Sequence, residues 1–118
     1  MCPVAIIKER LDGPVGIVEL DGRLTVNDQP GMLKEAVAGI VRRGAKNVLI
    51  DLSGVHYIDS TRLGELIAAH VTVSRHGGRL KLVRTPPRVV ELLLIAGLGD
   101  VFERFDSIED AKKSLSQA

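Results

Sequence analysis

The sequence predicts an α/β domain with a mixed, mostly parallel sheet of about four to five strands. Short apolar runs rich in branched residues alternate with longer stretches of helical periodicity. A tight turn joins the first two apolar runs, which indicates an opening antiparallel hairpin. Alternation after that hairpin favours parallel strands, because a parallel pair needs a crossover connection. The expected order of elements is therefore β-β-α-β-α-β-α-β-α.

The hairpin is expected from residues 3–11 and 15–20. Both runs carry branched apolar side chains, and Asp12-Gly13-Pro14 between them is a turn sequence. Gly22 follows the second run, where a residue without a side chain can absorb a tight backbone bend. We therefore expect the second strand to end at Leu20.

The first helix is expected after a polar segment. Asn27 or Asp28 can cap its start, and Pro30 is acceptable within the first turn. Apolar residues then recur at helical spacing up to Val41, which predicts one buried face. Gly44 is expected to end this helix in a left-handed conformation.

A buried strand over residues 47–51 leads to the stretch that organises the chain. Ser53-Gly54 is predicted to be a turn, and a helix is expected from Ser60 to Arg75. Leu63, Leu66 and Ile67, followed by His70 or Val71, are expected on its inward face. Gly77-Gly78 stops the helix.

The last third repeats the alternation. Residues 79–83 are predicted to form a strand, and a helix starting at Thr85-Pro86-Pro87 is expected to be stopped by Gly97 or Gly99. A short last strand is expected over residues 101–105. Ser107 and Asp110 have the spacing of a capping box, which predicts a terminal helix.

Composition excludes several functional classes. The 118 residues fit one domain, and a net charge of +1 indicates no partnership with nucleic acid or anionic lipid. No apolar run reaches the roughly 18 residues of a membrane span. Because the N-terminus also lacks a secretion signal, a cytoplasmic protein is expected. Cys2 is the single cysteine, so no internal disulfide can form.

Asp59, Ser60 and Thr61 stand where the second helix begins, and two interpretations apply to them. In the first, they serve only as caps, because their side chains accept hydrogen bonds from the first-turn N–H groups. Alternatively, Ser60 is a switchable hydroxyl. A phosphate there adds roughly −1.5 to −2 charges at a helix N-terminus, where anions are tolerated.

The segment D-L-S-G-V-H-Y-I-D-S-T-R-L-G resembles the signature of STAS domains, the anti-sigma factor antagonists of bacteria. The resemblance runs from about Ile6 to Lys112, and it implies the element order given above with helices largely on one face. In this family the serine directly after the second Asp is phosphorylated by a partner kinase, which implies Ser60. Thr61 is the second choice.

The resemblance also implies a non-enzymatic partner switch. The unphosphorylated protein would bind an anti-sigma factor that is a serine kinase, through Asp59, Ser60, Thr61, Arg62 and Gly64. Phosphorylation would release it, and a PP2C-type phosphatase would reset it. Arg62 departs from the small residue usual in the family, and it would pair with the phosphate or with an acidic patch on the partner. The sequence leaves open a homodimer and a second reading, a constitutive scaffold subunit that is never phosphorylated.

No catalytic, metal or cofactor motif stands out, so no cofactor and no enzymatic activity are expected. His56, His70 and His76 lack the spacing of metal ligands, and His70 is read as a satisfied helix residue. A phospho-accepting Asp51 is rejected because the acidic residues that would hold Mg²⁺ are missing. A basic stretch is interpreted as solvated surface, with a weak anion or nucleotide contact as the alternative. It comprises Arg75, Arg79, Lys81, Arg84 and Arg88.

Overall fold

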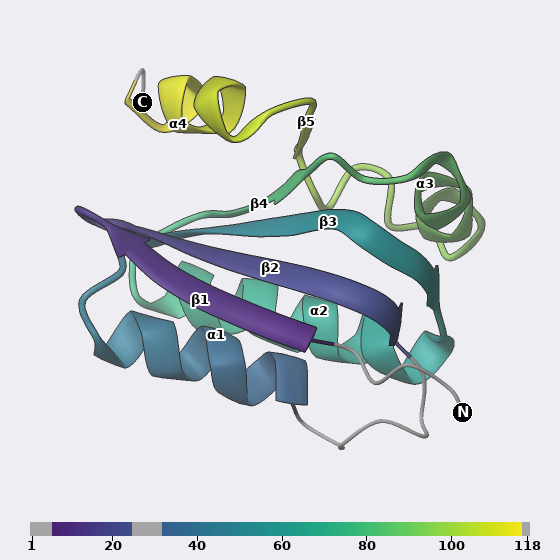
Figure 1. Cartoon of the computed structure of the whole chain (residues 1–118), viewed down its shortest axis with the longest axis horizontal. Coiled ribbons are helices and arrows are strands. Elements are labelled where there is room, and N and C mark those ends of the chain that lie inside the picture. Colours follow the sequence, from purple (N-terminus) through teal and green to yellow (C-terminus); the bar gives the residue numbers. More distant parts are fainter. Residues whose placement is uncertain (1–5, 25–31, 117–118) are drawn as a thin grey trace.

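Five strands and four helices follow one another in the predicted order in the described part of this computed structural model, residues 6–24 and 32–116 (Figure 1). The elements are β1 (Ile6–Asp12), β2 (Val15–Leu24), α1 (Met32–Arg42), β3 (Asn47–Ile58), α2 (Ser60–Arg75), β4 (Leu80–Val83), α3 (Pro87–Ile95), β5 (Arg104–Phe105) and α4 (Ile108–Ser116). Cys2, residues 3–5 of the first predicted strand, and the predicted cap at Asn27 or Asp28 with Pro30 lie outside the described residues.

The strands form one mixed sheet in the order β1-β2-β3-β4-β5. β1 pairs antiparallel with β2, as the predicted hairpin requires, and the other three pairs are parallel. Helices α1 and α2 lie side by side on one face, whereas α4 covers the opposite face (Figure 1). The α/β class, the strand number and the mostly parallel sheet are confirmed, and α4 is the exception to helices on one face.

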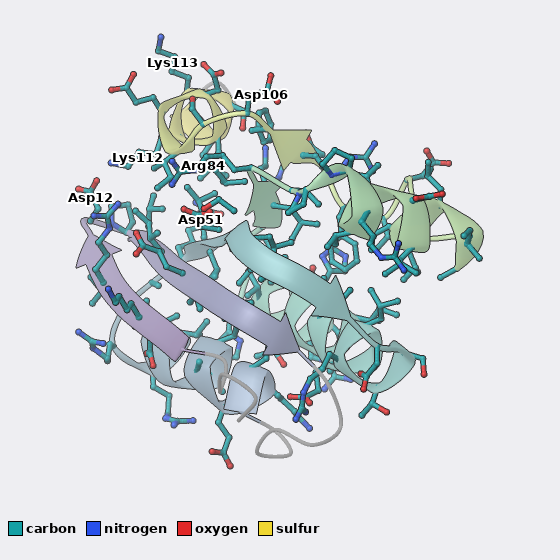
Figure 2. All side chains as sticks on the ribbon, turned by 45° about the vertical axis from the view of Figure 1, so that its right-hand side comes forward. Asp12, Asp51, Arg84, Asp106, Lys112 and Lys113 are labelled. Carbon is teal, nitrogen blue, oxygen red and sulfur yellow. The ribbon has the colours of Figure 1, made fainter. Side chains whose placement is uncertain are left out.

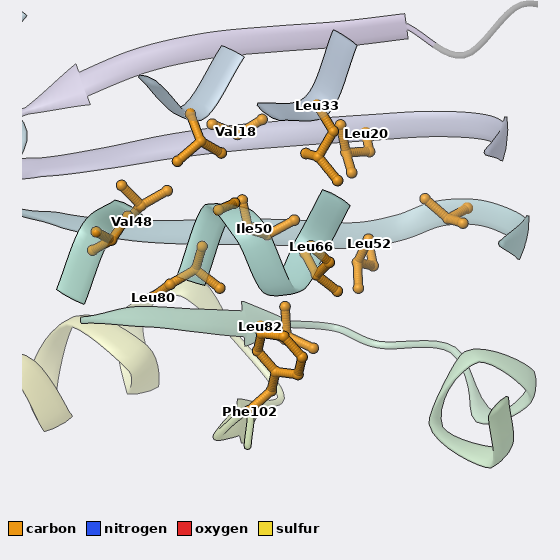
Figure 3. Close-up of a cluster of buried hydrophobic side chains, with 14 of the residues drawn as sticks. Val18, Leu20, Leu33, Val48, Ile50, Leu52, Leu66, Leu80, Leu82 and Phe102 are labelled. Atoms are coloured by element: carbon orange, nitrogen blue, oxygen red, sulfur yellow. The ribbon is translucent and has the colours of Figure 1, made fainter. Parts of the chain in front are cut away.

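The main core fills the space between the sheet and helices α1 and α2. Alternate strand residues point into it because successive side chains of a strand face opposite sides, and Leu33, Leu66 and Phe102 complete it from outside the sheet (Figure 3). The strand residues of this set are Val18, Leu20, Val48, Ile50, Leu52, Val55, Ile58, Leu80 and Leu82. Few aromatic residues take part, as the composition of the chain dictates.

A smaller core lies between the other face of the sheet and α4. Ile17, Leu49 and Val83 meet Ala111 there. Lys81 shares this face and is only 2% exposed, so its predicted place on a solvated surface is wrong. Its ammonium donates to the hydroxyl of Ser114 at 2.8 Å and lies 5.1 Å from the centre of the Phe105 ring. The long apolar stem of lysine and these polar contacts make the burial tolerable.

Strand β3 is longer than predicted and does not turn at Ser53-Gly54. Its pairing with β2 runs from Asn47 to Ile58, with two register shifts. At the first shift β3 advances three residues, from Asp51 to Gly54, while β2 advances two, from Glu19 to Asp21. Each shift inserts an extra residue, a β-bulge, which bends a strand without ending its pairing. Turn-type residues were therefore accommodated inside a strand.

Two further boundaries and the buried stripe of α2 differ from the prediction. β2 continues to Leu24 because its end pairs with the bulged part of β3, so Gly22 does not end the strand. The last strand is only Arg104–Phe105, since Phe102 turns into the main core instead of joining the sheet. On α2 the buried stripe continues through Ala69 and Val73, whereas Val71 is 41% exposed.

Two glycines meet backbone demands that other residues cannot meet. Gly44 ends α1 with φ +112°, the left-handed cap that the sequence predicts. At Gly78 an added Cβ would lie 1.6 Å from the carbonyl oxygen of Lys46. The turn after α2 therefore packs directly on the backbone before β3.

Replacing Gly78 by alanine should be strongly destabilising. The clash is with backbone rather than with a flexible side chain, so we expect a loss of about 3 kcal/mol in the free energy of unfolding. Gly64→Ala is the matched control, because nothing lies within 4 Å of a Cβ there. In a helix that change should stabilise by about 0.5–1 kcal/mol. Urea unfolding of both variants tests this, and equal stabilities would contradict it.

Candidate functional site

At the start of α2, Asp59 caps the helix and its neighbour Ser60 is exposed. Asp59 is the N-cap, and its carboxylate accepts the backbone N–H of Arg62 at 2.9 Å. The capping interpretation is thus confirmed for Asp59. Ser60 is the first helical residue and is exposed. Asp59 accepts one of the free N–H groups of the first turn, and Ser60 lies exposed beside the positive end of the helix dipole.

Ser60, Thr61 and Gly64 form one exposed patch, called here the α2 face. Ser60 and Gly64 are four residues apart and so lie on the same side of the helix. Gly64 was expected to allow a close approach to the sheet or to a partner, but open space surrounds the position of its Cβ. No other described part of the domain therefore packs on this residue, and the surface around Ser60 is accessible to a partner.

Arg62 does not belong to the α2 face. Its side chain is 1% exposed and pairs with the carboxylate of Glu65, which is itself mostly buried. Residues two apart on a helix point to nearly opposite sides, so Arg62 is directed away from Ser60. The expectations that Arg62 pairs with a phosphate on Ser60, or reaches an acidic patch on a partner, are therefore wrong for this conformation.

The position of Arg62 in the helical repeat indicates from the sequence that its side chain is buried. Arg62 stands four residues before Leu66, seven before Ala69 and eleven before Val73, all on the buried stripe of α2. Glu65 follows at the three-residue spacing that lets helical side chains meet. Glu65 also accepts the backbone N–H of Lys34 at 3.3 Å, in the first turn of α1. The pair thus joins the starts of the two helices.

His70 is not fully satisfied, contrary to its interpretation from sequence. Its ring meets the edge of Phe102 at a centroid distance of 5.5 Å, and its buried Nδ1 has no hydrogen-bond partner. The apolar contact accounts for its place between α2 and the segment before β5. In the described residues no group of three or more His, Cys, Asp or Glu could hold a metal ion.

Asp51 forms a second polar site on the α4 side of the sheet. It is 3% exposed and pairs with Arg84, and Figure 2 shows the two together below α4. The backbone N–H of Ser53 donates to the carboxylate at 2.9 Å. Burial alone would raise the pKa of Asp51. The hydrogen bonds from Ser53 and the Arg84 guanidinium outweigh burial and hold that pKa below its ordinary value of 3.8.

Asp51 should make the fold sensitive to acid. Because its pKa is lower in the folded state, the ionised carboxylate stabilises the fold above pH 3.8, and this contribution disappears as the pH falls through the folded pKa. Asp51→Asn should therefore flatten the decline of stability below about pH 4. Asp100→Asn, at an exposed position, is the control. Urea midpoints between about pH 5 and pH 2.5 test this, and an unchanged slope in Asp51→Asn would contradict it.

Sequence comparison supplies the identity of the fold. The sequence model of the STAS domain matches residues 5–111. The chain belongs to the STAS domain family. The anti-sigma-B factor antagonist of Bacillus subtilis is 34% identical over 86 residues, which cover 73% of this chain and 77% of that protein. No helix among the described residues is long and apolar enough to cross a membrane.

Solved structures show the same STAS fold. An anti-sigma factor antagonist from Mycobacterium paratuberculosis superposes with a TM-score of 0.82 at 21% identity, covering 95% of this chain and 94% of that one. The antagonist SpoIIAA of Bacillus in its unphosphorylated form gives 0.77 at 15%, covering 96% and 98%. Its phosphorylated form gives 0.71 at 14%, covering 92% and 98%. At these identities the likeness concerns the fold alone.

Proposed function

We propose that this STAS domain is an anti-sigma factor antagonist that acts by binding, with Ser60 as its phosphorylation switch. The observation that carries the proposal is the exposed hydroxyl of Ser60 at the start of α2, beside an N-cap that Asp59 already provides. The name of the Bacillus subtilis relative supports the class of function. That SpoIIAA exists in phosphorylated and unphosphorylated forms supports the kind of switch.

The unphosphorylated α2 face docks on an anti-sigma factor that is also a serine kinase. Docking occupies that factor and leaves its sigma factor free. A phosphate on Ser60 is compatible with the fold, since an anion near a helix N-terminus is favourable by about 0.3–1 kcal/mol. At the interface, however, the same dianion must be buried against a surface matched to a neutral hydroxyl, which costs several kcal/mol. The complex therefore dissociates while the domain stays folded.

A PP2C-type phosphatase resets the switch, and the circuit works in the cytoplasm without a cofactor. Thr61 is the second candidate acceptor because it is exposed in the same turn. The buried Arg62 supports the helix start through Glu65 instead of contacting the partner.

Phosphorylation by the kinase tests the proposal directly. After incubation with ATP and the anti-sigma kinase from the same genome, intact mass should show the gain of one phosphate, and peptide mapping should place it on Ser60. Ser60→Ala should gain none, whereas Thr61→Ala should still gain one. A constitutive scaffold subunit would gain none in any variant. A phosphate on Thr61 or elsewhere in the wild-type protein would contradict the assignment of Ser60.

A further inference from the structure

The α4 side of the sheet carries a polar cleft beside α4, distinct from the α2 face. The cleft encloses about 260 Å³ and draws on β1, β2, β3 and the residue after β4. Glu19 and Asp51 form its floor, two residues beyond the Ile17 and Leu49 that pack under α4. The charged and polar lining consists of Lys8, Glu19, Asp51, Ser53, Gly54 and Arg84.

Two backbone irregularities meet at this cleft. Arg84 has φ +51°, and among the described residues it is the only non-glycine residue with a positive φ. The first bulge of β3 brings Ser53 and Gly54 to the same place. Strained backbone persists where surrounding contacts hold it, and both strain and bulges are concentrated at ligand sites. Here the N–H of Arg84 donates to the carbonyl of Phe105 at 2.8 Å, which holds the residue after β4 in position.

The buried carboxylate of Asp51 holds the guanidinium of Arg84 in a fixed orientation. It already accepts a hydrogen bond from the N–H of Ser53 and pairs with the guanidinium. A guanidinium carries five N–H donors, so one carboxylate leaves others available. The side chain of Arg84 is 48% exposed, and it lines the cleft. Asp51 therefore acts as a fixed counter-ion, and Arg84 as an oriented donor group.

The opposite wall of the cleft carries a second cation. Lys8 is exposed on β1, directly across the hairpin from Glu19. The carboxylate of Glu19 lies 3.8 Å from Arg10 and remains partly exposed on the floor. From β1 to β4 there are three strand spacings of about 4.8 Å, which long side chains shorten by leaning inward. The cleft thus offers a cation at each end and an acceptor between them.

We propose that this cleft binds a small acidic metabolite with an acidic group at each end and a hydroxyl or amine between them. Arg84 and Lys8 would each bind one acidic end, and Glu19 would accept a hydrogen bond from the middle of the ligand. Arginine in a fixed orientation suits carboxylate and phosphate groups alike. The volume lies just below the roughly 300–1,000 Å³ of sites for drug-sized ligands, which sets the small size of the metabolite.

Two probes that differ in their acidic groups test the proposal. The ¹⁵N-labelled protein is titrated separately with malate, a hydroxy-dicarboxylate, and with 3-phosphoglycerate, while amide signals are followed by NMR. We expect saturable shifts at Ser53, Gly54 and Arg84 with at least one probe, and the stronger probe identifies carboxylate or phosphate as the preferred group. Glycerol should cause none. If neither acidic probe produces saturable shifts at these amides, the proposal is wrong.

Charge-removing variants establish whether the two cations bind the probe. Lys8→Gln and Arg84→Gln should each weaken binding about tenfold or more. Arg88→Gln removes the same charge from an exposed position outside the lining and should change nothing. Lys8 is exposed on an edge strand, so its variant keeps the test decisive even if Arg84→Gln disturbs the fold. Equal weakening by Arg88→Gln would overturn the proposal. Neither the anti-sigma kinase nor Ser60 takes part, so the result is independent of the partner switch.

Discussion

Ser60→Asp should lose affinity for the anti-sigma kinase by about a hundredfold or more. The exposed hydroxyl at the start of α2 is neutral, and the variant places a permanent charge where the partner closes over the α2 face. A penalty of about 3 kcal/mol corresponds to that loss. The domain itself should keep its circular dichroism spectrum, because a carboxylate is favourable at a helix N-terminus.

Two variants separate the position of the charge from its sign. Ser60→Ala keeps the site neutral and should bind as the wild type does. Ser74→Asp adds the same charge to an exposed position near the other end of α2, and it should also bind normally. Calorimetric titration of the kinase with all three variants measures this. If Ser60→Asp binds as tightly as Ser74→Asp, the switch does not lie at the helix start.

Glu65→Gln should destabilise the domain by about 3 kcal/mol, because it removes the carboxylate that faces a buried guanidinium. Arg62 is 1% exposed, and Glu65 also accepts the N–H of Lys34 at 3.3 Å. The change therefore affects the helix start that presents Ser60 and the first turn of α1 at once. Urea unfolding monitored by circular dichroism gives the free energy.

A double replacement distinguishes a lost ion pair from lost packing. Changing Arg62 to Met and Glu65 to Leu together removes both charges, and we expect it to recover most of the stability that Glu65→Gln loses. Glu91→Gln, at an exposed position of α3, controls for the loss of a surface carboxylate and should be neutral. An unfolding midpoint of Glu65→Gln equal to that of the wild type would show that the pair contributes nothing.

The sequence predicted the fold well because periodicity and turn residues agree along most of the chain. The hairpin, the three parallel pairings and the start of α2 at Ser60 all follow from local patterns. Ser53-Gly54 was misread because its turn chemistry is real, yet pairing with β2 keeps it inside β3 as a bulge. Local preference was overridden there by the hydrogen bonds of the neighbouring strand.

The candidate site was predicted only in its exposed part. Asp59 and Ser60 stand at a helix start, so the cap at Asp59 and the exposure of Ser60 follow from their position. Arg62 and Lys81 were assigned to the surface because charged residues are rarely buried. Their burial depends on partners that only the fold brings near: Glu65 stands close in sequence, whereas Ser114 is 33 residues from Lys81. Arg84 likewise meets Asp51 only because β3 and β4 are neighbours.

The affinity of the anti-sigma kinase for this protein before and after phosphorylation tests the central claim most directly. Calorimetric titration should show tight binding of the unmodified protein and binding at least about a hundredfold weaker once Ser60 carries phosphate. Treatment with a PP2C-type phosphatase should restore the first value. Equal affinities of the two forms would contradict the account, since a dianion on the α2 face would then have no effect on binding of the partner.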